Sequence, residues 1–131
     1  MNYEEKIKEA IDSRLNWKHC THFYIGKTID FENRRIDHLQ GENNCCHYDY
    51  CWELSKGTPE QISKLENNLI LYYKDEKRDK RLDNQNAGSA GNNKADTLYV
   101  AYCYEDETIS INEIADDELP IKDGFPLNLH K

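Results

Sequence analysis

A strand that leads directly into a helix is indicated by residues 21–39. Residues 21–25 are mostly aromatic or β-branched, which is typical of a short strand. Gly26 should let the backbone turn sharply at the end of this strand, and Asp30 is suited to cap a helix over residues 30–39. This segment therefore predicts a fold in which a helix follows directly after a strand of a sheet.

The polar side chains of this segment are suited to a phosphate group. Tyr24 stands near the end of the predicted strand, and Lys27 follows it three residues later. Arg34 and His38 are spaced i and i+4, so both project from one face of the predicted helix. Arginine and lysine donate readily to phosphate oxygens. We therefore expect a phosphate-binding cluster here.

Two further strands and an N-terminal helix are predicted from hydrophobic periodicity. Apolar residues every four positions indicate an amphipathic helix over residues 2–15. Alternation over residues 47–54 indicates a second strand, and residues 97–104 have the strongest strand pattern in the chain. This order predicts an α/β fold of the α+β type, with a small, mostly antiparallel sheet of about three strands flanked by helices.

The clearest helix start lies at Thr58. Thr58 can act as N-cap, Pro59 fits the first helical position, and Gln61 completes a capping box. The helix should run to about residue 74. We therefore expect a third helix directly after the second strand.

Glu66 lies within the apolar stripe of this third helix. A buried carboxylate is costly unless it is paired, hydrogen-bonded or bound to a metal ion. The alternative is that the apolar face is wide and Glu66 lies on its solvated margin, near Lys64 or Lys74. Taken alone, Glu66 is better explained by that alternative.

The sequence predicts a single domain whose acidic residues are concentrated in its C-terminal part. At 131 residues we expect one domain, residues 1–131, in which residues 1–16 add an N-terminal helix and residues 95–131 form a C-terminal strand and an acidic tail. The net charge of −8 argues against binding to polyanions. However, residues 1–94 hold fifteen basic and sixteen acidic side chains, whereas residues 95–131 hold two and nine. The phosphate-binding cluster thus lies in a nearly neutral part.

The cysteines and the apolar residues indicate the cellular compartment of the protein. The odd number of cysteines, five, and the adjacent pair Cys45 and Cys46 are typical of reduced thiols. No signal peptide and no membrane-spanning apolar run is visible, so we expect a cytoplasmic protein without membrane association. Cys45, Cys46 and His47 could bind zinc together with Cys51, with or without Cys20. The paired spacing of a structural zinc site is missing, so zinc is not favoured.

Four separated segments carry the strongest functional signal. They are Tyr24-Ile25-Gly26 with Lys27-Thr28, the pair Arg34 and His38, Glu66-Asn67, and the turn that begins at Asn84. In this order they resemble the GIY-YIG nuclease family, whose name motif ends in Tyr-Ile-Gly. The tripeptide alone is common, but the joint order is fairly specific.

The resemblance implies a metal-dependent endonuclease that hydrolyses phosphodiester bonds in DNA. Glu66 would hold one divalent ion, Mg²⁺ or Mn²⁺, acting as a Lewis acid. Arg34 would clamp the phosphoryl oxygens, and His38 would position or deprotonate the attacking water.

Three further residues receive roles from the resemblance. Tyr24 would orient water or substrate, and Lys27 would favour its phenolate. Asn84 would order the loop or donate to a phosphate. No appended DNA-binding module is visible, so a protein partner or a homo-oligomer would supply target selection.

The first family motif, Gly-Ile-Tyr, is missing. It should lie on a strand about a dozen residues before Tyr24, but residues 11–17 contain no tyrosine. The strand at residues 97–104 could take its place, with Tyr99 on one face or Tyr102 and Tyr104 on the other. We favour Tyr102, although each of these tyrosines could instead be an ordinary core residue. The alternative function is a degenerate module that binds nucleic acid, a nucleotide or a protein without cleavage.

Overall fold

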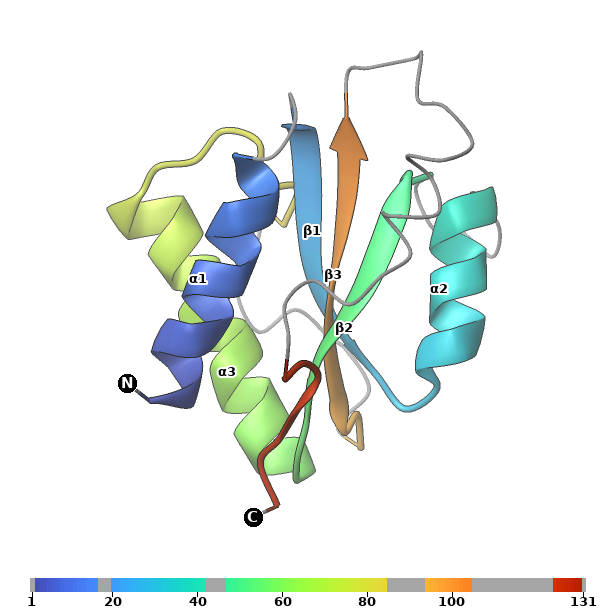
Figure 1. The fold of residues 1–131 in the computed structure, drawn as a ribbon, viewed down its shortest axis with the longest axis vertical. Helices are drawn as coiled ribbons and strands as arrows, with labels where there is room; N and C mark the ends of the chain where they lie inside the picture. The colour runs from blue at the N-terminus through green and yellow to red at the C-terminus, as the bar shows by residue number, and fades with distance from the viewer. Residues whose placement is uncertain (1, 17–19, 42–46, 85–93, 105–123, 131) are drawn as a thin grey trace.

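A four-stranded sheet with helices on both faces forms the part of the chain that the structure describes (Figure 1). The computed structural model describes residues 2–16, 20–41, 47–84, 94–104 and 124–130. The strands are β1 (Cys20–Thr28), β2 (Tyr50–Lys56), β3 (Thr97–Tyr104) and β4 (Leu127–Asn128). The helices are α1 (Tyr3–Leu15), α2 (Phe31–Gln40) and α3 (Pro59–Leu71), which continues into the π-helical turn η1 (Tyr72–Glu76).

The strand order is β1-β3-β2-β4, with β3 antiparallel to both β1 and β2. The predicted α+β fold is therefore confirmed. The sheet is mixed, however, because β4 pairs parallel with β2 through Ser55 and Leu127. The sequence did not indicate this strand, since Pro126 and Gly124 interrupt the apolar pattern around it.

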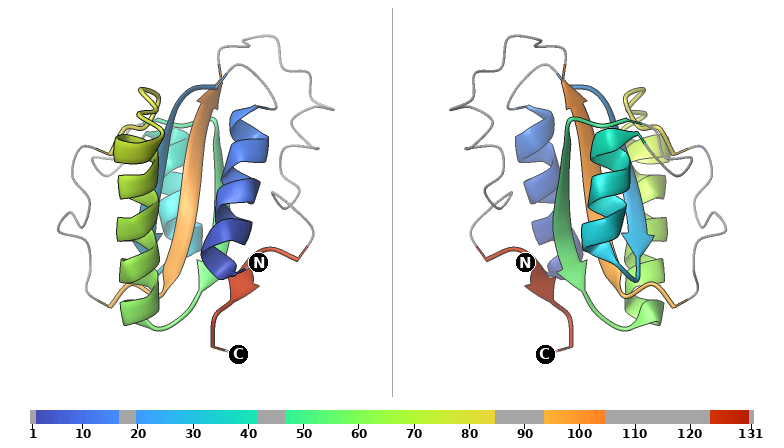
Figure 2. Two further views of the ribbon diagram at one scale, coloured as in Figure 1. Left: turned by 90° about the vertical axis from the view of Figure 1, so that its left-hand side faces the viewer. Right: turned by 90° about the vertical axis from the view of Figure 1, so that its right-hand side faces the viewer.

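Two layers of helices enclose the sheet. Figure 2 shows α1 and α3 on one face and α2 on the other. The larger core lies on the α1 and α3 face and includes Phe23, Ile25 and Tyr102. A smaller cluster on the α2 face includes Tyr48 and Tyr99. Because side chains alternate along a strand, Tyr99 and Tyr102 of β3 point to opposite faces.

Local capping sets where the helices begin, as predicted. The Asp30 side chain accepts a hydrogen bond from the backbone N–H of Asn33, at 3.2 Å. Thr58 and Gln61 form both bonds of a capping box at the start of α3. The left-handed conformation of Gly41, with φ of 69°, ends α2. These caps hold the two helices that carry Arg34, His38 and Glu66.

Gly26 does not end the strand, in contrast to the prediction. β1 continues to Thr28, and Gly26 pairs with Tyr99 of β3. A Cβ atom at Gly26 would lie 2.5 Å from both Cζ and Oη of Tyr99 and 2.7 Å from Cε1 of Tyr24. Glycine is therefore needed here because two aromatic rings occupy the space of a side chain.

None of the helices in the described ranges has the length and apolar character needed to cross a membrane.

Candidate active site

An aromatic cluster on the α2 face brings together three elements. It consists of Tyr24 from β1, His38 from α2, Tyr99 from β3 and Tyr48, which precedes β2. The ring of Tyr24 lies 5.6 Å from that of His38 and 6.2 Å from that of Tyr99, between centroids. Tyr24 is half-buried, whereas the other three are buried. Tyr24 is thus the member most open to a substrate.

A direct hydrogen bond joins His38 and Tyr99. Nε2 of His38 lies 2.9 Å from the hydroxyl oxygen of Tyr99, and both side chains are buried. Which group donates depends on the protonation state of the imidazole. The Tyr48 ring packs edge-on against His38, with centroids 5.3 Å apart, and holds the imidazole in place. The pair can therefore hold or pass a proton inside the protein.

Arg34 lies one helical turn before His38 and is half-buried. The spacing of i and i+4 places it on the same side of α2 as His38, as the sequence predicted. A half-buried guanidinium one helical turn from His38 can donate to an anionic oxygen.

Asn84 covers the outer edge of β1. Its Oδ1 accepts a hydrogen bond from the N–H of Ile25 at 2.9 Å, and its Nδ2 donates to the carbonyl of Ile25 at 2.8 Å. Next to it, the N–H of Phe23 donates to the carbonyl of Arg81, and the N–H of Asp83 donates to the carbonyl of Phe23. Asn84 thus orders the edge of the strand that carries Tyr24.

Tyr48 also connects the cluster to this edge. Its hydroxyl donates to Oδ2 of Asp83 at 2.6 Å, and Nδ1 of His22 lies 2.6 Å from the same oxygen. Tyr48 and Asp83 lie outside every motif that the sequence displays, so no role for them could be predicted. Their position follows only from the folded arrangement of β1 and the segment before β2.

Glu66 is buried on α3, with 4% of its surface exposed. This excludes the solvated margin considered above. Burial raises the pKa of its carboxyl to about 7, and the positive charge of Lys27 opposes this shift. Within the described residues, Oε1 of Glu66 has no hydrogen-bond partner. A buried carboxylate oxygen without a partner is costly, and a divalent cation would compensate it. Glu66 therefore fits an oxygen-ligated ion such as Mg²⁺ or Mn²⁺.

Lys27 belongs with Glu66 and not with Tyr24. Its Nζ donates to Oγ of Ser63 at 3.0 Å, and Ser63 lies one turn before Glu66 on α3. Lys27 and Tyr24 point to opposite faces of β1, since they are an odd number of residues apart. The candidate residues therefore form two groups, one on each face of this strand.

Tyr102 is not part of either group. It is fully buried, and its hydroxyl donates to the carbonyl of Ile11 in α1 at 3.1 Å. Burial raises the pKa of its phenol well above the ordinary value. We favoured Tyr102 over Tyr99 as the replacement for the missing first-motif tyrosine, but the tyrosine of β3 that lies next to Tyr24 and His38 is Tyr99. Gly26 indicates Tyr99 only once the pairing of β1 with β3 is known, because that register places Tyr99 opposite Gly26.

Comparison with known proteins gave no match to a family model, a curated protein or a solved structure. The resemblance to the GIY-YIG family thus rests on the residues of this chain.

Proposed function

We propose that this protein is a metal-dependent endonuclease of the GIY-YIG type that hydrolyses phosphodiester bonds in DNA. The observation that carries the proposal is the position of Tyr99. It lies over Gly26 of the Tyr-Ile-Gly motif, next to Tyr24, and its hydroxyl contacts His38. The sequence lacks the first family motif before Tyr24, and Tyr99 supplies a second tyrosine next to Tyr24.

The strand order supports a replacement of the first family motif by a strand that comes later in the chain. A strand a short distance before Tyr24 would pair with β1 as an antiparallel hairpin. β3 is the antiparallel neighbour of β1, although it lies about 70 residues later in the chain. We infer that Tyr99 of β3 takes the role of the tyrosine in the first motif.

The roles of the residues follow from their exposure and contacts. Tyr24 and Arg34 are half-buried, so a phosphodiester would meet them first. Arg34 would donate to the phosphoryl oxygens and stabilise the charge that develops there. Tyr24 would orient the attacking water, and the bonded pair of His38 and Tyr99 would accept its proton.

From the resemblance, Glu66 would hold the divalent ion, which would supply Lewis-acid chemistry when bound. Glu66 belongs to α3, on the face of the sheet opposite Tyr24 and Arg34, so a phosphodiester that meets both groups would have to span an edge of the sheet. Lys27 would favour the ionised form of the Glu66 carboxyl, because its charge opposes the rise in pKa that burial causes. Asn84 would keep the edge of β1 in register rather than contact the substrate, because its amide bonds both backbone groups of Ile25.

We further infer a cytoplasmic location and help from a partner. The odd number of cysteines and the adjacent pair Cys45 and Cys46 are typical of reduced thiols in a reducing compartment. The excess of acidic residues in the C-terminal part disfavours broad contact with DNA, so a protein partner or a second copy would supply target selection.

The direct test uses the purified protein with Mg²⁺ or Mn²⁺ and supercoiled, linear, branched and single-stranded DNA. We expect the parent to nick at least one substrate and Glu66→Gln to lose this activity. Glu60→Gln, an exposed acid in the first turn of the same helix, is the control that should retain it. No cleavage of any substrate, together with binding that needs no metal, would instead support the binding module.

A further inference from the structure

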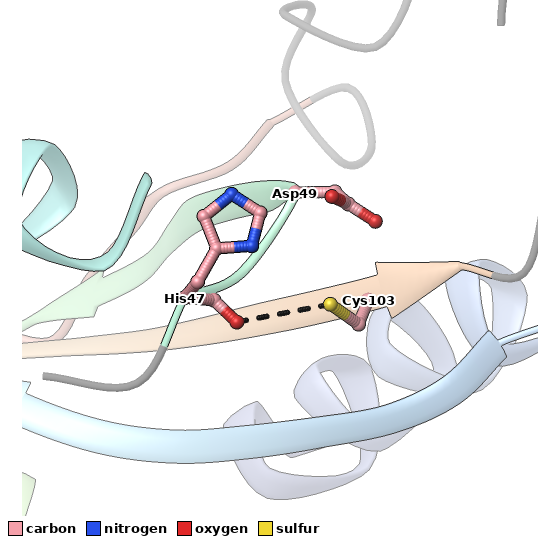
Figure 3. Close-up of side chains that lie close together, drawn as sticks. All are labelled: His47, Asp49 and Cys103. Carbon is pink, nitrogen blue, oxygen red and sulfur yellow. Dashed lines mark hydrogen bonds between the residues drawn. The ribbon is translucent and has the colours of Figure 1, made fainter. Parts of the chain in front are cut away.

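Three side chains of ligating type converge where β2 begins and β3 ends (Figure 3). His47 and Asp49 precede β2, and Cys103 is the penultimate residue of β3. One ring nitrogen of His47, one carboxylate oxygen of Asp49 and the sulfur of Cys103 lie within 4.8 Å of one another. None of the three has a role in the proposed nuclease.

The backbone holds this group in place. The N–H of Asp49 donates to the carbonyl of Tyr102 at 2.9 Å and so extends the pairing of β2 with β3. The N–H of Tyr104 donates to Oδ2 of Asp49 at 3.0 Å and orients the carboxylate. Asp49 therefore stands opposite Cys103, with both side chains on the same face of the sheet. A carboxylate that a backbone amide orients is a common feature of metal sites.

His47 contacts Cys103 through its backbone carbonyl. Its carbonyl oxygen lies 3.8 Å from the sulfur of Cys103, as the dashed line in Figure 3 marks. Its imidazole is exposed and lies close to both other side chains. The segment from His47 to Asp49 is thus fastened to the end of β3 at two points.

One nitrogen, one oxygen and one sulfur ligand are a combination that suits zinc. Zinc binds such atoms at about 2.0–2.3 Å in a tetrahedron, so ligand atoms should lie roughly 3.5 Å apart. Small rotations of the side chains, at least one of which is exposed, would close the present separation. Magnesium and calcium, by contrast, do not favour a thiolate ligand.

We propose that His47, Asp49 and Cys103 bind one zinc ion. This site is distinct from that of Glu66, because Asp49 and Cys103 lie on the α2 face of the sheet and Glu66 belongs to α3 on the other face. Three protein ligands leave the fourth position to water or another ligand. On binding, the thiol of Cys103 releases its proton to solvent and a zinc–sulfur bond forms, without any change of oxidation state.

Burial, together with the nearby charge of Asp49, raises the pKa of Cys103 to about 11. Without a cation this thiol therefore stays protonated and donates to the carbonyl of His47. Zinc would fix Tyr48, which stands between His47 and Asp49 and packs against His38. The ion would thereby stabilise one wall of the aromatic cluster.

The test uses Co²⁺ as a spectroscopic probe of the full chain, with a reductant that does not bind metals. We expect one equivalent of Co²⁺ to produce a sulfur-to-cobalt charge-transfer band and the visible bands of four-coordinate cobalt. Zn²⁺ should displace it. Cys103→Ser should abolish the charge-transfer band, whereas Cys20→Ser and Cys51→Ser should keep it.

His47→Gln gives a second variant that should fold normally, because His47 is exposed. It should weaken Zn²⁺ binding at least about tenfold and remove the rise in melting temperature that Zn²⁺ gives the parent. Glu66→Gln should bind Zn²⁺ as the parent does, which separates this result from any test of cleavage. The proposal is overturned if the parent shows no charge-transfer band, or if the band persists in Cys103→Ser.

Discussion

The ring of Tyr99 lies over the backbone of Gly26, its partner in the pairing of β3 with β1. No side chain fits between them, because even a Cβ atom would come within 2.5 Å of the ring. The glycine of the Tyr-Ile-Gly motif is thus explained by a residue more than 70 positions away in the chain. This contact also holds the hydroxyl of Tyr99 against His38.

Gly26→Ala is expected to destabilise the protein by about 1–3 kcal/mol, because the rings of Tyr99 and Tyr24 must move to admit the methyl group. Urea unfolding measures this free energy. In a Tyr99→Ala background the same change should be much less destabilising, since the ring is gone. An equal loss in both backgrounds would show that the Tyr99 ring is not the obstacle.

The stability of the metal-free protein should fall as the pH rises through the range set by Glu66. The ordinary pKa of this carboxyl is 4.5, and in the folded protein burial raises it to about 7. The folded state thus binds the proton of Glu66 more tightly than the unfolded state does. The resulting contribution to the free energy of unfolding is fully present below pH 4.5 and is lost above pH 7.

Glu66→Gln removes this penalty, so at pH 8 without metal it should be more stable than the parent, by up to about 3 kcal/mol. At pH 4.5 the two proteins should differ little. Mn²⁺ at pH 8 should raise the melting temperature of the parent and leave that of Glu66→Gln unchanged. If the parent and Glu66→Gln were equally stable at pH 8 without metal, the result would contradict a cost of burying the Glu66 carboxylate.

Asn84→Ala should expose the edge of β1. The change removes both hydrogen bonds to Ile25 and leaves a buried N–H and carbonyl without partners, for a loss of about 1–3 kcal/mol. Hydrogen exchange at the amide of Ile25 should become faster. Asn67→Ala, on the half-buried side of α3, serves as the matched control. Unchanged protection of Ile25 in Asn84→Ala would contradict the proposed ordering role.

The parts of the fold that depend on near neighbours in the chain could be predicted from sequence. The caps at Asp30 and Thr58 are examples, because each uses a hydrogen bond that spans three residues. Hydrophobic periodicity likewise located α1 and β3, and the i and i+4 spacing placed Arg34 and His38 together.

The parts that depend on strand pairing could not be predicted. A change of one residue in register moves a side chain to the other face, so the sequence alone could not decide between Tyr99 and Tyr102. Lys27 was placed wrongly for a different reason: we expected the strand to end at Gly26, but β1 continues to Thr28, and its alternation turns Lys27 away from Tyr24. The parallel pairing of β4 with β2 joins segments about 70 residues apart, and no local pattern encodes it.

The central claim is that Tyr99 completes the catalytic site of a DNA endonuclease. Two matched variants test it, because Tyr99→Phe and Tyr102→Phe each remove one buried hydroxyl from the same strand. The first loses the contact with His38, and the second loses the bond to the carbonyl of Ile11.

The deciding measurement is the rate of metal-dependent DNA cleavage by the parent and both variants, at a temperature where all three are folded. The proposed site predicts that Tyr99→Phe lowers the rate roughly 10²-fold or more, as loss of a proton-transfer group does, while Tyr102→Phe stays within about threefold of the parent. Cleavage by Tyr99→Phe at the parental rate, or a selective loss in Tyr102→Phe, would contradict it.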